Sequence, residues 1–182
     1  MIIIQRIATA IGILVFSLGL AHAANAQPLT PQQVERFIAS MPETAALGDK
    51  HDDNKRRTID PAQPLTSSLK LMDKQSPAYA DLAQLASRHG FSSVEQWANV
   101  GDRTIAAYGI AASGVTTSEV EAGYQQGIAN INKDPGLTAA KKEAILVGMK
   151  KGHQRNMNAR QSVEPDLAAV RPHMTELGKL LE

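Results

Sequence analysis

Apolar residues recur every three to four positions along most of this chain, which is the period of an amphipathic α-helix. The first apolar stripe consists of Val34, Phe37, Ile38 and Met41. Its helix is expected to begin after Thr30, an N-cap that Gln33 closes into a capping box, with Pro31 at the first helical position. Pro42 is expected to end or kink the helix, leaving one further turn over residues 43–47.

Start and stop signals between the later stripes predict the remaining helices. Thr116 with Glu119 forms another capping box, and Ser113-Gly114 ends the helix before it. The expected later helices cover residues 65–72, 77–89, 92–112, 117–133, 139–161 and 167–181. No segment has the alternation of a strand. The chain is therefore predicted to be all-α, a compact bundle of five to seven short-to-medium helices, with the apolar helix over 139–161 at its centre and the last helix bent at Pro172.

A sharp corner between two helices is expected just after Gly90, which is the predicted left-handed residue at a helix end. Ser92 and Glu95 have the S-x-x-E spacing of a capping box that would start the next helix. Phe91 and Trp97, the only tryptophan, are expected to pack inside this corner.

The first 26 residues have the pattern of a cleaved signal peptide. Arg6 precedes an uncharged apolar run over Ile7–Leu20, and two small-residue cleavage sites follow, ending at Ala23 and Ala26. Cleavage is expected after Ala26, with Ala23 as the alternative; an uncleaved membrane anchor is the competing interpretation. Residues 27–182 are then expected to be one exported domain, periplasmic or secreted, of a Gram-negative bacterium.

Composition narrows the class of protein further. The chain has no cysteine, which excludes disulfides and the usual cysteine-linked lipoprotein anchor. Nineteen Lys and Arg stand against 18 Asp and Glu, so no strongly basic surface for nucleic acid is expected. Residues 48–64 carry one strongly apolar side chain, Ile59, and are expected to form a mobile polar loop.

Aromatic and glycine residues suggest a binding groove between helices. Gly123 and Gly127 lie four residues apart, where another helix backbone could come close. The candidate groove residues are Phe91, Trp97, Tyr108, Gly123, Tyr124 and Gly127. Such a groove would bind a partner helix or a small apolar ligand. The competing interpretation is that the aromatic residues are simply core.

Candidate chemistry is sparse. His153 and Met157 share a helix face, and with His173 they could bind copper. His89 at a helix end suggests capping, and Asp102-Arg103 suggests surface ion pairs. There is no catalytic cysteine, no G-x-S-x-G motif and no phosphate-binding loop, so an enzyme is not favoured and no cofactor is expected.

The run Leu-Thr-Pro-Gln-Gln-Val-Glu-Arg-Phe-Ile-Ala-Ser over residues 29–40, the His-Gly-Phe-…-Trp corner and the closing Ala-Val-Arg-Pro-His-Met resemble small exported proteobacterial proteins of unknown function. The L-T-P-Q-Q opening is also similar to the periplasmic helical chaperones of the Spy/CpxP type. These resemblances imply an exported helical domain and no activity. The leading hypothesis is a non-enzymatic protein that binds an envelope protein or an apolar ligand; a copper-binding protein and a chaperone-like envelope stress protein are the alternatives.

Overall fold

The computed structural model describes residues 27–51 and 59–181. The expected signal peptide and residues 52–58 of the expected loop lie outside this range. The described residues are all-α, as predicted, and contain no strand. The helices are α2 (Pro31–Lys50), α3 (Pro64–Lys70), α4 (Pro77–Arg88), α5 (Val94–Ala112), α6 (Thr117–Lys133), α7 (Ala139–Val163), α8 (Leu167–Val170) and α9 (Met174–Leu181), with single 3₁₀ turns over Glu164–Asp166 and Arg171–His173.

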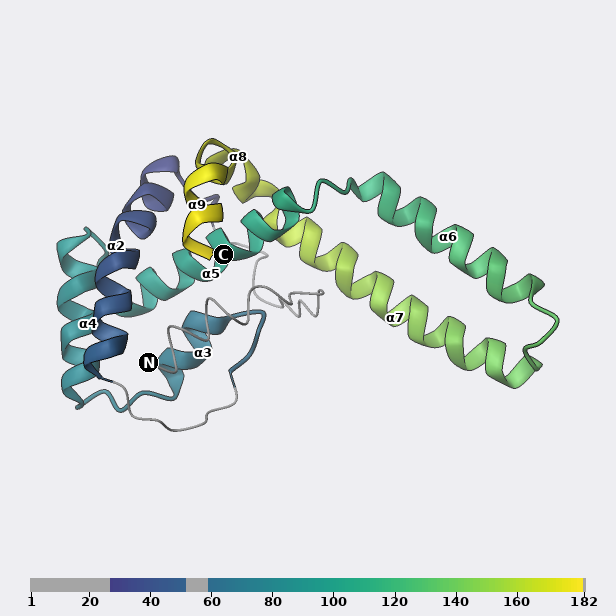
Figure 1. Cartoon of the computed structure of the whole chain (residues 1–182), viewed down its shortest axis with the longest axis horizontal. Coiled ribbons are helices and arrows are strands. Elements are labelled where there is room, and N and C mark those ends of the chain that lie inside the picture. The colour runs from purple at the N-terminus through teal and green to yellow at the C-terminus, as the bar shows by residue number, and fades with distance from the viewer. Residues whose placement is uncertain (1–26, 52–58, 182) are drawn as a thin grey trace.

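The molecule consists of a helical body and a projecting arm (Figure 1). The body is built from α2, α3, α4, α5, α8 and α9, with α5 running through its centre. The arm is the antiparallel hairpin of α6 and α7, which extends away from the body and returns to it at the end of α7.

The hydrophobic core lies entirely in the body and the root of the arm. Phe37 of α2 is fully buried against Trp97 of α5, with ring centroids 6.0 Å apart and planes tilted by 47°. Gly101 lies at the closest approach of three helices, because a Cβ at this position would collide with Phe37 and with Leu65 of α3. Trp97 packs inside the body, as expected. Gly101 explains how α2 and α3 can pack so close to α5, because it has no Cβ.

Most predicted helix ends are confirmed, and one is displaced by a residue. Gly90 has a φ of +76°, as expected for the left-handed residue after α4. The N-cap of α5, however, is Ser93 and not Ser92: its hydroxyl accepts a hydrogen bond from the Gln96 backbone N–H. Both serines have an acidic or amide side chain three residues later, so the local pattern fits either start. The helix begins after Ser93, and the side-chain oxygen of Gln96 accepts a hydrogen bond from the Ser92 backbone N–H at 2.6 Å.

Pro42 was expected to end or kink the first helix, and it does not end it. The helix α2 continues to Lys50, so the first residues of the expected polar loop are helical, and Pro64 at its other end begins α3. Residues on both sides of Pro42 face the core, with Met41 and Thr44 buried. Packing of that continuous face outweighs the backbone hydrogen bond that proline cannot donate.

The helix expected at the centre of the bundle is instead the outer part of the molecule. Only Ala159, Arg160 and Val163, at the end of α7, are buried. Further out, Ile145 and Val147 are 37% and 48% exposed. Apolar residues are spread around α7 and do not form a single stripe, and α6 covers one side alone, so apolar content by itself did not predict burial.

Asp102 and Arg103 do not form the surface ion pairs that the sequence suggested. The carboxylate of Asp102 is buried and accepts hydrogen bonds from the backbone N–H groups of Leu65 and Thr66, at 2.8 and 3.0 Å. It thereby caps α3, whose own N-cap residue Gln63 contributes no side-chain bond. Burial raises the pKa of Asp102, against the lowering effect of these hydrogen bonds.

Arg103 instead joins distant parts of the chain. Its guanidinium donates to both carboxylate oxygens of Asp166, at 2.8 and 2.6 Å. Asp166 is 1% exposed and also accepts from the backbone N–H of Leu29 at 2.8 Å. One buried ion pair therefore connects the start of α2, the middle of α5 and the junction between α7 and α8, where the arm meets the body.

Candidate functional site

Hydrogen bonds connect the two helices of the arm at its outer end and at its root. Thr116 starts α6 with the predicted capping box to Glu119, and Thr138 caps α7 as predicted. At the outer end, Lys142 donates to the carbonyl of Asn132 at 2.7 Å. At the root, the buried guanidinium of Arg160 donates to the carbonyl of Val115 at 2.7 Å. These contacts hold α6 and α7 together as one hairpin.

Between these ends, the seam of the arm is held by ring stacking and thin apolar packing. Tyr124 stacks on His153 with ring centroids 4.0 Å apart and planes 2° from parallel. His153 also lies 2.9 Å from a carboxylate oxygen of Glu121. Gly127 faces the methyl group of Met149, which a Cβ at residue 127 would approach to 2.7 Å. The Gly127 position therefore meets the flexible end of a side chain and not another backbone.

No residue of α6 is buried. A two-helix arm covers only one side of each helix, so the apolar seam residues Val120, Tyr124, Ile128 and Ile131 stay partly exposed. On α7, Ile145 and Val147 are exposed as well. The arm thus leaves apolar side chains of both helices partly or fully exposed.

The arm is also where basic charge is concentrated. Among its residues, α7 carries six lysine and arginine side chains and one glutamate, whereas α6 carries two glutamates and one lysine. Lys141, Lys150, Lys151 and Arg155 are exposed and form no ion pair within the part of the chain that the structure describes. The nearly equal numbers of acidic and basic residues in the whole sequence did not predict this local excess of basic side chains on α7.

The six residues predicted to line one groove fall into two separate groups. Phe91 and Trp97 are 5% and 3% exposed and belong to the body core, and Tyr108 packs partly buried against that core. Gly123, Tyr124 and Gly127 lie together on α6 in the arm. The core group is therefore Phe91, Trp97 and Tyr108, and the arm group is Gly123, Tyr124 and Gly127.

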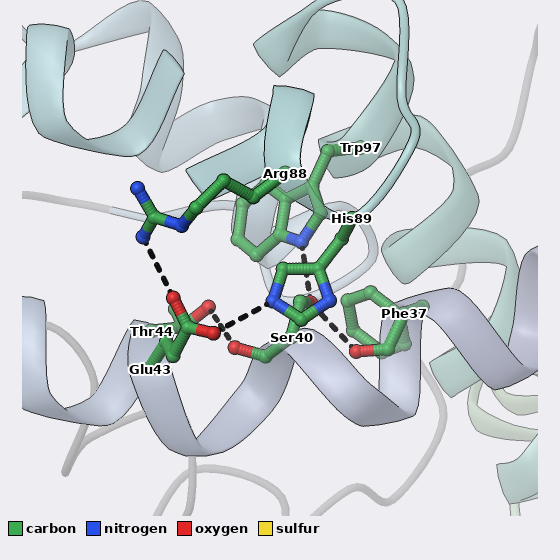
Figure 2. Close-up of polar contacts among 7 residues, drawn as sticks. All are labelled: Phe37, Ser40, Glu43, Thr44, Arg88, His89 and Trp97. Atoms are coloured by element: carbon green, nitrogen blue, oxygen red, sulfur yellow. Dashed lines mark hydrogen bonds and ion pairs between the residues drawn. The ribbon is translucent and has the colours of Figure 1, made fainter. Parts of the chain in front are cut away.

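Trp97 has its polar atom satisfied inside the body, which explains its core role. Figure 2 shows its indole N–H pointing at Ser40 of α2, to which it donates at 2.9 Å. Ser40 in turn donates to the carbonyl of Phe37 at 2.6 Å. A buried tryptophan with a fully bonded N–H stabilises the packing of α2 on α5.

The three residues considered for copper do not lie on one element. His153 and Met157 are on the arm, and His173 follows α8 in the body, 3.0 Å from Glu176 and 3.9 Å from Glu35. Across residues 27–51 and 59–181, no group of three or more His, Cys, Asp or Glu side chains is placed to hold a metal ion.

The body carries one further polar surface feature where α2 meets the end of α4. Arg88 and His89 converge on the carboxylate of Glu43, at 2.7 and 3.0 Å (Figure 2). These partners, Arg88 first, lower the pKa of Glu43. Beside them lies an open cleft of about 450 Å³ lined by Glu35, Arg36, Ala39, Arg88, His89 and Gly90. His89 is the C-cap residue of α4, as its sequence position predicted, but its carboxylate partner could not be predicted locally.

Two carboxylates of α5, Glu95 and Asp102, are seven residues apart and have separate structural roles. Glu95 is exposed and accepts from Tyr79 and Lys74, at 3.1 and 3.3 Å. Asp102, two turns further along α5, is buried as the cap of α3. The two side chains therefore do not form a catalytic pair.

Comparison with known proteins leaves the function to be argued from the structure, since no family model, curated protein or solved structure matches this chain. None of the described helices is long and apolar enough to cross a membrane.

Proposed function

We propose that this protein is an exported, non-enzymatic binding module of the bacterial envelope, and that the α6–α7 arm is the element that docks onto a partner protein. The observation that carries the proposal is the exposure of α6, which buries none of its residues although it presents an apolar stripe. Export is supported by the signal-peptide pattern of residues 1–26.

The arm suits docking better than the body does. Helices that bury an apolar face against the rest of a fold gain most of their stability there, and α6 lacks that contact. Partner binding would cover an exposed apolar side chain such as Val147 and would use the basic side chains of α7 for orientation. The cleft beside Glu43 is less suited to docking, because two of the residues that line it, Arg88 and His89, already bind Glu43.

Site-specific photocrosslinking in intact cells tests this proposal. A photoreactive amino acid placed at Val147 of the arm is expected to capture one dominant protein, because this side chain is exposed on the docking element. The matched control is the same amino acid at Lys70, an exposed position on the body. Equal products from both positions, or none from either, would contradict the assignment. Many unrelated products from Val147 alone would favour a chaperone-like role of the arm.

Export is tested separately by fractionation and amino-terminal sequencing of the protein from its native cells. The expected result is protein in the periplasm or medium that begins at Gln27. Protein that remains in the cytoplasm with Met1 intact would contradict this part of the proposal.

A further inference from the structure

One side of the arm is open along both helices. Helical periodicity and the contact of Gly127 with Met149 place Gly123 on the same side of the arm as Ile145 and Gly148. We call this surface the open face; it comprises Gly123, Ile145, Gly148 and Gly152, beside the contact of Gly127 with Met149. A Cβ added at Gly123, Gly148 or Gly152 would meet no atom within 4 Å, so another helix could approach these backbones closely.

The charges beside the open face are complementary to those of a second arm. Glu119 of α6 lies five residues, and Arg155 of α7 two residues, from the stacked pair of Tyr124 and His153, both toward the root of the arm. The two residues are therefore within about one helical turn of each other along the arm. A two-fold axis along the arm would place α6 of one copy against α7 of the other. Each Glu119 would then lie within about one helical turn of Arg155 of the second copy, and the basic helices would not face each other.

The size of the surface supports a reversible association. Two helices about 10 Å wide and about 25 Å long present roughly 500 Å² per copy, or about 1,000 Å² for a pair. That is close to the lower limit for a specific interface. A pairing of this area would form at high protein concentration and dissociate on dilution.

We propose that the open face of the arm binds the same face of a second copy of this chain, with α6 of each copy against α7 of the other in a four-helix bundle. This inference rests on the proposed function, because it takes the arm as the docking element and names its partner. The bundle would cover Ile145 of α7, which the hairpin leaves 37% exposed.

Sedimentation velocity of the purified protein over a range of concentrations tests the pairing. The wild-type protein is expected to shift from monomer to dimer as concentration rises. Gly148→Leu should remain monomeric, because its side chain would separate the two faces. The Tm of this variant should not fall, since residue 148 has open space and glycine is the poorer helix former. The matched control is Gly109→Leu, an open helical glycine of α5, which should dimerise normally.

A charge test uses the opposite ends of the expected ion pair. Arg155→Glu should weaken the dimer by about tenfold or more, because each introduced glutamate would face Glu119 of the other copy. Adding Glu119→Gln in that background should recover part of the loss. Glutamine at this position removes the repulsion and can still close the capping box with Thr116. The wild-type dimer should also weaken as salt is raised.

The outcomes separate this inference from the proposed function. A protein that stays monomeric at every concentration, or a dimer that survives both Gly148→Leu and Arg155→Glu, would overturn the pairing of open faces. Arm-specific crosslinks to another protein would leave the docking function standing in that case. Conversely, a dimer with the expected variant pattern but no crosslinked partner in cells would confirm the pairing and contradict docking onto another protein.

Discussion

Thr104, a residue of α5, combines complete burial with an unsatisfied hydroxyl. Its side-chain oxygen has no hydrogen-bond partner within the described residues, and the residue is 0% exposed. Asp102, two positions earlier, shows the opposite case, because both of its oxygens accept backbone N–H groups. The same helix therefore buries one polar side chain without a partner and another whose oxygens both accept hydrogen bonds.

Thr104→Val is expected to stabilise the protein by about 1 kcal/mol. The change keeps the shape of the side chain and removes the desolvation cost of an unpaired hydroxyl. Thermal unfolding should show an increase in Tm of about 2–4 °C for a domain of this size. An unchanged or lower Tm would mean that the hydroxyl has a partner, such as a buried water molecule.

Asp166→Asn is expected to destabilise the protein by about 3 kcal/mol. It removes the charge that pairs with Arg103 in a buried setting, and the amide cannot accept at both oxygen positions. Chemical denaturation with urea measures the loss. The neighbouring exposed residue provides the control, because Glu164→Gln should change the unfolding free energy by less than about 0.5 kcal/mol.

At the scale of elements, ion pairs of two carboxylates connect α2 to α4. Glu43 binds Arg88 and His89, and Asp81 of α4 binds Lys50 and His51. These partners, Arg88 and Lys50 first, lower the pKa values of Glu43 and Asp81. Both contacts are at the surface, so their effect on stability is expected to be small and sensitive to salt.

The α2–α4 contact is expected to weaken in acid. A carboxyl group whose pKa is lower in the folded state contributes stability above its unfolded pKa, and this contribution is lost as pH falls through the folded value. For Glu43 the loss begins near its ordinary value of 4.5 and continues below it. Glu43→Gln should therefore lower stability at neutral pH and flatten the pH dependence of the unfolding free energy between about pH 5 and pH 3. A variant with the wild-type slope would show that the contact does not contribute.

At the scale of the whole molecule, the body and the arm differ in how they are stabilised. The body buries a continuous core around α5, whereas α6 buries no residue and α7 is buried only where it joins the body. Regions with few buried contacts open at lower free energy than the core. The arm should therefore be the least protected helical part of the described chain.

Hydrogen exchange should reveal this difference directly. Backbone amides of α6 are expected to exchange at least tenfold faster than those of α5 in dilute protein, because their hydrogen bonds open without disruption of the core. Mass spectrometry of peptides from the two helices measures the rates. Equal protection of α6 and α5 in a monomer would contradict the division into a stable body and a weakly supported arm.

The sequence by itself determined the helical class and most helix ends. Hydrophobic periodicity and the caps at Thr30, Thr116 and Thr138 act within a few residues, so they could be predicted locally. The same local signals failed at Pro42, where core packing continues the helix past a residue that favours a break. They also predicted the left-handed Gly90 correctly and placed the next cap one residue early.

Only the tertiary structure decided which helices form the core and which form the candidate binding surface. The predicted groove mixed core residues such as Trp97 with arm residues such as Gly123, because periodicity shows that a helix has an apolar face but not what covers it. The buried pairing of Arg103 with Asp166 and the projection of α6 and α7 both depend on residues far apart in the chain. Long-range packing has no signature in a local pattern, which is why the arm, the central feature of the proposed function, appeared only with the fold.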